Sequence, residues 1–166
     1  MFVRAREQQL LRAAEFLTAD RHLAEDLLQV ALTKTYVAWP VAARGDPYAY
    51  TRRVLVTSSI DMWRRRRWRE RPVPDPAAAG SADWQADDSD QVVERDRLLT
   101  ALGALTARER SVVVLRYCED LSERDVAAIL NVSTGTVKST ASRALAKLRL
   151  DPLVGHPEEA AADAHI

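Results

Sequence analysis

Four consecutive arginines flanked by tryptophans form the densest cationic and aromatic segment of the sequence. The run comprises Arg64, Arg65, Arg66 and Arg67, and it stands between Trp63 and Trp68. Guanidinium groups neutralise the backbone phosphates of nucleic acids, and aromatic rings stack on unpaired bases. The segment therefore predicts contact with nucleic acid, with Tyr48, Tyr50 and Trp63 as candidates for stacking. A solvated helix end is the alternative for the arginines, and packing in the core is the favoured alternative for each aromatic residue taken singly.

A second set of candidate DNA contacts lies towards the C-terminus, within a helix-turn-helix pattern. Ser122 and Ser133 are suitable N-caps for two successive helices, and Asn131-Val132 forms a tight turn between them. The first residues of the second helix of this motif reach the major groove, where hydroxyls and cations contact bases and phosphates. The predicted contacts are Thr134, Thr136, Lys138, Ser139, Thr140 and Arg143. The alternative is the solvated face of an ordinary three-helix bundle.

No residue pattern points to an enzyme. The three histidines are far apart, the only cysteine is Cys118, and the paired carboxylates Asp87 and Asp88 fall in a segment that is typical of a linker. The sequence also lacks a glycine-rich phosphate loop. We therefore expect no catalytic residue, no metal, no cofactor and no small-molecule substrate. Because no apolar run is long enough to cross a membrane and the N-terminus lacks a signal-peptide core, we expect a cytoplasmic protein that does not contact a membrane.

The charge of the chain is separated into blocks, although 24 basic and 24 acidic residues among 166 cancel to zero. Residues 1–71 carry a net +6 and residues 94–149 a net +3, whereas residues 72–93 carry −5 and residues 150–166 carry −4. The acidic segment 72–93 is rich in proline and small residues, so a flexible linker is predicted there. The acidic tail is predicted to be disordered. Two basic modules therefore remain, each able to contact a polyanion.

Both modules show helical periodicity and almost no strand alternation, so the predicted fold is all-α, with two small helical domains joined by the flexible linker. The first module is expected to be a three-helix bundle, and the second a helix-turn-helix unit. Helices are expected over residues 3–17 and 21–39, from residue 47 through the arginine run, over 92–105, from 107 to near 118, over 123–130 and over 134–148. Asp20, Asp46 and Thr106 are expected N-caps, and Thr106 with Glu109 forms a capping box. Residues 40–45 are expected to form a loop.

The motifs of the two modules, in this order and spacing, resemble those of sigma factors of the extracytoplasmic-function type. The matching segments are His22-Leu-Ala-Glu-Asp-Leu-Leu-Gln29, residues 46–56 with the Trp-flanked arginines, residues 105–110 and residues 121–139. The resemblance covers residues 3–149, and within this group the sequence looks most like an actinobacterial branch often labelled the sigma-E family. It implies a non-catalytic protein that binds core RNA polymerase, directs it to promoters and helps to open the duplex.

The resemblance also implies roles for single residues. Asp26, Leu27 and Gln29 match the surface that docks on the clamp helices of the largest polymerase subunit, and the second domain is expected to bind the flap. The expected contacts with the −10 element and single-stranded DNA are Tyr50, Arg53, Thr57, Ser58, Trp63, Arg64, Arg65 and Arg67. Lys138, Ser139 and Arg143 match positions that read the −35 element. Thr57 stands where many members have Asn, so the base preference at the −10 element is not assigned. Thr140 stands where many members have Arg, so the specificity for the −35 element is not assigned either.

Two alternatives belong to other functional classes. A stand-alone helix-turn-helix regulator, dimerising through its N-terminal bundle, would have no use for a single-strand stacking face beside the arginine run. A recombinase or nuclease would need metal-binding carboxylates near the basic face, and the sequence places none there. An anti-sigma factor is a further candidate partner, alongside polymerase and promoter DNA.

Overall fold

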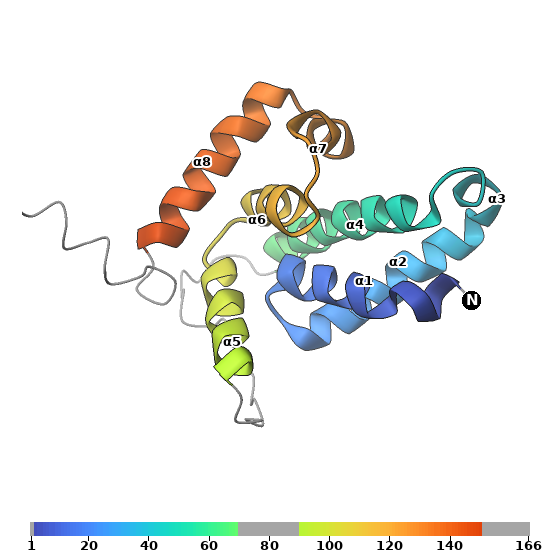
Figure 1. Cartoon of the computed structure of the whole chain (residues 1–166), viewed down its shortest axis with the longest axis horizontal. Coiled ribbons are helices and arrows are strands. Elements are labelled where there is room, and N and C mark those ends of the chain that lie inside the picture. Colours follow the sequence, from blue (N-terminus) through green and yellow to red (C-terminus); the bar gives the residue numbers. More distant parts are fainter. Residues whose placement is uncertain (1, 70–89, 151–166) are drawn as a thin grey trace, which may run out of the picture.

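The computed structural model describes residues 2–69 and 90–150, and all of its regular elements in these ranges are helices (Figure 1). The N-terminal domain contains α1 (Phe2–Thr18), α2 (Arg21–Val37), α3 (Trp39–Ala42) and α4 (Pro47–Arg69). The C-terminal domain contains α5 (Asp90–Gly103), α6 (Ala107–Val113), the π-helical segment η2 (Val114–Cys118), α7 (Glu123–Leu130) and α8 (Thr134–Leu150). The predicted all-α fold with two helical domains is thus confirmed. The predicted tail and most of the predicted linker lie outside the described residues.

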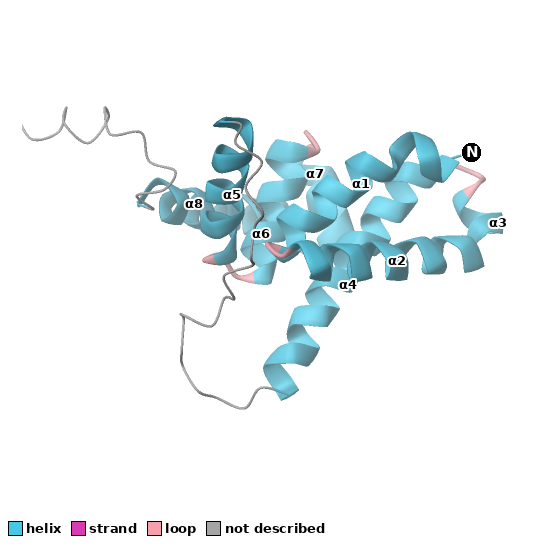
Figure 2. Ribbon diagram, turned by 90° about the horizontal axis from the view of Figure 1, so that it is seen from below, coloured by secondary structure: helices cyan, strands magenta, loops and turns pink. Residues whose placement is uncertain are grey.

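Helices α1, α2 and α4 form the bundle of the N-terminal domain, as predicted. The Asp20 side chain caps α2 by accepting a hydrogen bond from the backbone N–H of Leu23 at 3.0 Å. The predicted loop over residues 40–45 is partly wrong, because residues 39–42 form the short helix α3. Pro40 lies in the first turn of α3, where the missing N–H has no intrahelical partner to lose. Figure 2 shows that the C-terminal turns of α4 extend beyond the neighbouring helices.

Three helices of the C-terminal domain begin at N-caps that were predicted from the sequence. The Thr106 hydroxyl accepts from the N–H of Glu109, whose carboxylate accepts from the N–H of Thr106 at 2.9 Å, which completes the capping box. Ser122 and Ser133 cap α7 and α8, and Asn131 takes a left-handed conformation between them (φ 53°). Helix α5 begins at Asp90, so the predicted linker ends earlier than residue 93.

The two domains share one hydrophobic core. Two modules joined by a flexible linker would instead be expected to have separate cores. Val112 and Leu115 of the C-terminal domain belong to the same buried cluster as Leu10, Leu17 and Leu55 of the N-terminal domain. Helix α1 contacts α5, α6 and η2, and α4 contacts α6 and α7. Helix α6 therefore lies between α8 and the N-terminal domain (Figure 1).

A buried arginine adds polar contacts to this interface. Arg110 of α6 is 3% exposed and donates hydrogen bonds to the carbonyl oxygens of Leu17 at 3.1 Å and Leu105 at 2.9 Å. Its guanidinium also lies over the ring of Trp63, 5.2 Å from the centroid. Burial lowers the pKa of Arg110 to about 10, so the group stays charged at neutral pH. The guanidinium thereby ties α6 to both α1 and α4.

No helix within residues 2–69 and 90–150 combines the length and the apolar composition that a membrane crossing requires.

Candidate nucleic-acid interface

Helix α8 presents most of its predicted DNA contacts to solvent. Thr134, Lys138, Ser139 and Arg143 are exposed, and Thr136 is half-buried. Ser139 and Arg143 lie on the side of α8 away from the buried Val137, Ala141 and Ala144, and Lys138 lies on its flank next to α7. The exposed set combines hydroxyls and cations, which suits hydrogen bonding to phosphates and to base edges.

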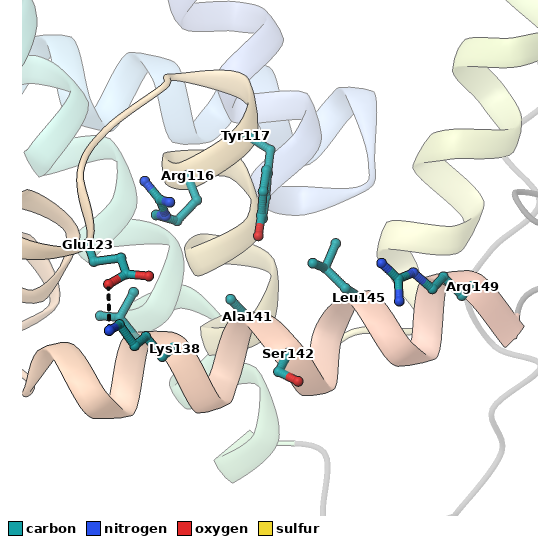
Figure 3. A pocket seen from close by; sticks show the side chains of 9 residues that line it. Arg116, Tyr117, Glu123, Lys138, Ala141, Ser142, Leu145 and Arg149 are labelled. Atoms are coloured by element: carbon teal, nitrogen blue, oxygen red, sulfur yellow. Dashed lines mark ion pairs between the residues drawn. The ribbon is translucent and has the colours of Figure 1, made fainter.

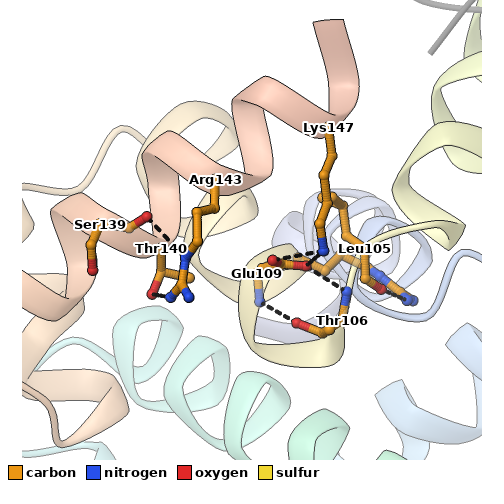
Figure 4. Close-up of polar contacts among 8 residues, drawn as sticks. Leu105, Thr106, Glu109, Ser139, Thr140, Arg143 and Lys147 are labelled. Carbon is orange, nitrogen blue, oxygen red and sulfur yellow. Dashed lines mark hydrogen bonds and ion pairs between the residues drawn. The ribbon is translucent and has the colours of Figure 1, made fainter. Parts of the chain in front are cut away.

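Thr140 is an exception, because it is only 2% exposed and therefore lies too deep for a direct base contact. It is three residues from Val137 and four from Ala144, both fully buried, so helical periodicity places it on the inner face of α8. Its hydroxyl accepts a long hydrogen bond of 3.4 Å from Arg143, and the Arg143 Nε donates to the carbonyl oxygen of Ser139 (Figure 4). Thr140 thus supports the position of Arg143 instead of contacting DNA.

A shallow hollow of about 280 Å³ lies beside the recognition face, between η2 and α8. Lys138 and Arg149 line it from α8, and Arg116 and Tyr117 line it from η2 (Figure 3). Lys138 forms an ion pair of 3.6 Å with Glu123 of α7 across its edge. Three cations against one carboxylate make the hollow electropositive, so it extends the basic surface of α8.

Helix α4 presents only part of its predicted −10 surface. Arg53 and Thr57 are exposed one turn apart, and Tyr50 is half-buried on the same side of the helix. The Thr57 hydroxyl donates to the carbonyl oxygen of Arg53 at 3.0 Å. Ser58 is 7% exposed, and its hydroxyl accepts a 3.0 Å hydrogen bond from Lys34 of α2. Ser58 therefore faces α2 in this structure, and its contact with DNA stays a prediction.

The C-terminal domain covers one side of this −10 surface. A groove of about 410 Å³ runs between the two domains, and Tyr50 and Arg53 line its N-terminal wall. Leu121, Asp125 and Ile129 line the opposite wall. A strand of DNA that reached Tyr50 would therefore meet α7 as well.

Trp63 does not offer a free stacking face. Its ring lies between the guanidinium of Arg66 and that of Arg110, each 5.2 Å from the centroid. The indole N–H is buried and has no hydrogen-bond partner among the described residues. Trp63 is thus half-buried with two guanidinium groups against its ring, and its stacking on a base stays a prediction.

The arginines beyond Trp63 stay on the surface where their side chains are described. Arg64 and Arg65 are exposed, and Arg64 forms a 3.0 Å ion pair with Asp61. The side chain of Arg67 lies outside the described part of the chain. The exposed arginines suit contact with DNA backbone phosphates, which do not require a preformed pocket.

Comparison with known proteins decides the family. A family profile described as "Sigma-70 region 2" matches residues 2–69, and one described as "Sigma-70, region 4" matches residues 95–148. The chain belongs to the sigma-70 family. Its helices α1–α4 are therefore region 2, and its helices α5–α8 are region 4.

Relatives and a solved structure agree with this result. The chain is 43% identical over 152 residues to the RNA polymerase sigma-E factor of Streptomyces avermitilis, covering 89% of this chain and 81% of that one. It is 30% identical over 168 residues to the ECF RNA polymerase sigma factor SigE of Mycolicibacterium smegmatis, covering 98% of this chain and 64% of that one. The sigma factor RpoE from Bartonella quintana, crystallised with the anti-sigma factor NepR, superposes with a TM-score of 0.64 at 26% identity, covering 89% and 91%. The extracytoplasmic-function resemblance is thereby confirmed.

The predicted polymerase-docking residues of the sigma factor lie on α2, but not all on its surface. Asp26 and Gln29 are exposed, whereas Leu27 is 3% exposed and packs in the core between the turns that carry Ala24 and Ala31. Leu27 is therefore reached only through the hollow between α2 and α4, which it lines beside Asp26, and its contact with polymerase stays a prediction. Val30, next to the fully buried Ala31, is 45% exposed.

Exposed apolar residues that the sequence analysis did not assign continue this surface of region 2. Val30 lies one turn from Asp26, and Tyr36 and Val37 at the end of α2 are 81% and 77% exposed. Between α2 and α4, a hollow of about 300 Å³ is lined by Asp26, Val30 and Met62 among others. Helical periodicity does not separate Val30 from the core, since it lies three residues after the buried Leu27, and only the structure shows that it is exposed.

A polar cluster between the two regions was also missed. Tyr48 of α4 is 7% exposed, and its hydroxyl donates to the Glu119 carboxylate, with O···O distances of 3.1 and 3.0 Å to the two carboxylate oxygens. Arg52 donates to the same carboxylate at 3.0 Å. Burial and the charge of Glu119 raise the pKa of Tyr48 above its ordinary range, so the phenol stays protonated. No sequence signal links these residues, which are about 70 positions apart.

Proposed function

We propose that the chain acts as a promoter-specific initiation factor in which α4 and α8 read different elements of one promoter. The observation that carries this proposal is the exposed hydroxyl and cation face of α8, within a segment that matches region 4. Core RNA polymerase supplies the chemistry, so the chain itself performs no catalytic step. Since its partners are polymerase and promoter DNA, it works in the cytoplasm.

Helix α8 reads the −35 element in this proposal. Lys138, Ser139 and Arg143 are exposed, and the adjacent Lys138 and Ser139 lie about one turn before Arg143, which matches the reach of a recognition helix in the major groove. Thr134 and Thr136 at its N-terminal end approach the backbone, where short hydroxyls bond to phosphates.

Helix α4 reads the −10 element as single-stranded DNA. Tyr50, Arg53 and Thr57 offer one aromatic ring, one cation and one hydroxyl on the same side, and Arg64 and Arg65 follow the backbone further along. Flipping a base out of the duplex costs about a few kcal/mol of free energy. Binding of the protein to the unstacked bases offsets this cost. Promoter opening then needs no nucleotide hydrolysis.

Polymerase provides most of the affinity. Asp26 and Gln29, with the exposed Val30, form the docking surface for the clamp helices, and region 4 contacts the flap. Tethering both regions to one polymerase raises their effective concentration at a promoter, so each region can bind DNA weakly on its own. An anti-sigma factor is a candidate regulator, because a structural relative was crystallised with one.

Reconstituted transcription tests the proposal. Purified core polymerase is assayed on promoter fragments from the source genome with the wild-type chain, with Lys138→Ala/Arg143→Ala, and with Arg149→Ala. Because a good base contact contributes about 1–3 kcal/mol, the double variant should lose roughly 10-fold or more in specific initiation while core binding persists. Arg149→Ala removes one positive charge at the far end of the same helix, where Arg149 lines the electropositive hollow, and should reduce initiation less than the double variant does.

Three results would contradict the proposal or a part of it. Failure of the wild-type chain to stimulate initiation on any promoter of the genome would refute the sigma-factor function. A footprint on palindromic DNA without polymerase would instead support the stand-alone regulator. Loss of core binding in the double variant would refute the assignment of Lys138 and Arg143 to DNA.

A further inference from the structure

Two donors of region 2 converge on a single carboxylate of region 4. The Tyr48 hydroxyl and the Arg52 guanidinium both bond to Glu119, whose side chain is 6% exposed. The Arg52 guanidinium lies 5.5 Å from the Tyr48 ring centroid, and the Arg6 guanidinium of α1 lies 5.2 Å from it. One cation and a phenol thus bond to the Glu119 carboxylate, and a second cation, Arg6, lies over the Tyr48 ring.

The Glu119 carboxylate does not accept a hydrogen bond from every N–H group of Arg52. Arg52 uses Nη1 towards Glu119, and its buried Nε has no hydrogen-bond partner among the described residues. A guanidinium bonds oxyanions best through two parallel N–H groups, and a phosphate offers more acceptor oxygens than a carboxylate. The site is therefore better matched to a phosphate than to the group that occupies it.

The position of the site along α4 indicates which phosphate. Arg52 is the neighbour of Arg53 and lies half a turn from Tyr50, both of which are proposed −10 contacts. Arg52 and Arg53 line the same groove of about 410 Å³ between the regions. A strand bound at Arg53 therefore has a direct path for its backbone to Arg52.

We propose that Tyr48 and Arg52 form a DNA-phosphate site of region 2, which Glu119 of region 4 occupies in the free protein. This inference rests on the proposed function. Promoter DNA and Glu119 compete for the same donors, so region 4 has to move away from α4 before the −10 strand is fully bound. Glu119 thereby lowers the affinity of the free chain for single-stranded DNA, and polymerase binding that separates the regions relieves this competition.

Binding of a fluorescein-labelled dT20 oligonucleotide to the full chain tests the site, measured by fluorescence anisotropy over a salt series. Glu119→Gln should bind dT20 at least about 3-fold more tightly than the wild type, because an amide holds Arg52 less strongly than a carboxylate does. Asp120→Asn is the matched control, since it removes the same charge one residue away at an exposed position. Asn also tolerates the positive φ of 49° found there. Its affinity should equal that of the wild type.

The double variant Glu119→Gln/Arg52→Gln tests the phosphate contact itself. It should lose the gain of Glu119→Gln, and the slope of log K against log salt should become shallower by about 0.7, the value for one phosphate contact on a single strand. Glu119→Gln/Tyr48→Phe keeps the ring and removes only the hydroxyl, so it provides the same test if the arginine variant does not fold. It should lose part of the gain.

Two outcomes would overturn the site. An equal gain in Asp120→Asn and Glu119→Gln would show a general charge effect without competition. Unchanged affinity and salt slope on loss of Arg52 in the Glu119→Gln background would show that Arg52 binds no phosphate. The same proteins are assayed in promoter-specific transcription, where failure of the wild type refutes the proposed function. Normal transcription with DNA binding that is indifferent to Arg52 refutes only the phosphate site.

Discussion

Helices α8 and α4 carry the two predicted DNA surfaces, and they differ in how much of that surface is open. Helix α8 packs on α6 and α7 from one side, so its opposite face is free to meet a duplex. Helix α4 contacts α1, α2, α6 and α7, and so part of its DNA surface faces the other region. The comparison shows that the accessibility of a basic helix depends on the number of its neighbours more than on its own sequence.

This difference has a consequence for promoter binding. The free sigma factor presents its −35 surface almost completely, but its −10 surface is bordered by α7 and its Tyr48–Arg52 pair is occupied by Glu119. In the proposed function, reading both elements at once requires the two regions to separate, which would break the shared core and the hydrogen bond from Arg110 to Leu17. Polymerase binding is the step that can supply the required free energy.

The largest expected effect comes from the shared core. Leu115→Ala removes a fully buried side chain of η2 and should cost about 2–5 kcal/mol of unfolding free energy, as for other large-to-small core substitutions. Because that core includes residues of region 2, the loss should also shift the urea transition seen by tryptophan fluorescence. All four tryptophans lie before residue 90, so this signal reports on region 2 and the linker.

A second probe of the same variant provides the contrast. Circular dichroism follows the helices of both regions, and its transition should coincide with that of fluorescence. A shift of the transition in circular dichroism alone would show that region 2 unfolds independently. It would contradict a core that both regions share. Leu148→Ala removes a side chain from a second buried cluster at the far end of α8 and should lower the unfolding free energy by less than Leu115→Ala does. The fluorescence and circular dichroism transitions of this variant should still coincide.

The next effect distinguishes the two faces of α8. Thr140→Arg forces a long charged side chain into a packed position and should destabilise the fold by about 1–3 kcal/mol. Ser139→Arg places the same side chain on the exposed face and should change stability by less than about 0.5 kcal/mol. Thermal unfolding of both variants measures the difference. A stable Thr140→Arg with raised affinity for promoter DNA would contradict the burial of this position.

The smallest effect concerns an ion pair within region 4 and its dependence on pH. The Lys147 ammonium donates to both carboxylate oxygens of Glu109 at 2.9 Å (Figure 4). Burial raises the pKa of Glu109, but hydrogen bonds from Lys147 and Thr106 outweigh burial and hold the pKa below its ordinary value. Lys147→Met should cost on the order of 1 kcal/mol at pH 7, because it leaves the carboxylate with fewer donors.

The sign of the pH dependence follows from the lowered pKa. The stabilisation is complete above the pKa of Glu109 in the unfolded chain, and it is lost as the pH falls through the lower folded value. The difference in unfolding free energy between Lys147→Met and wild type should therefore shrink between pH 7 and pH 3. Glu25→Gln, in an exposed pair with Arg21, is the control and should have almost no effect at either pH. An undiminished loss at pH 3 would show that Lys147 acts by packing alone.

Much of the local structure could be predicted, and so could part of the site. Asp20, the Thr106–Glu109 box, Ser122 and Ser133 cap helices as predicted, because a cap bonds to a backbone N–H only two or three residues away. The inward positions of Leu27 and Thr140 also follow from helical periodicity. Both were nevertheless predicted as contacts, Leu27 from the resemblance and Thr140 from the helix-turn-helix pattern, because neither assignment takes account of burial.

The amino-acid order alone determined the helices, their caps, the two basic modules and the family, since each of these depends on residues close together in the chain or on matched motifs. Only the tertiary structure decided that the modules share a core, that Arg110 bonds to Leu17, and that Glu119 occupies the donors of Tyr48 and Arg52. These pairs are about 70 to 90 residues apart, and their contact depends on how whole helix surfaces fit together. That fit involves many weak contacts at once, and no short segment of sequence contains it.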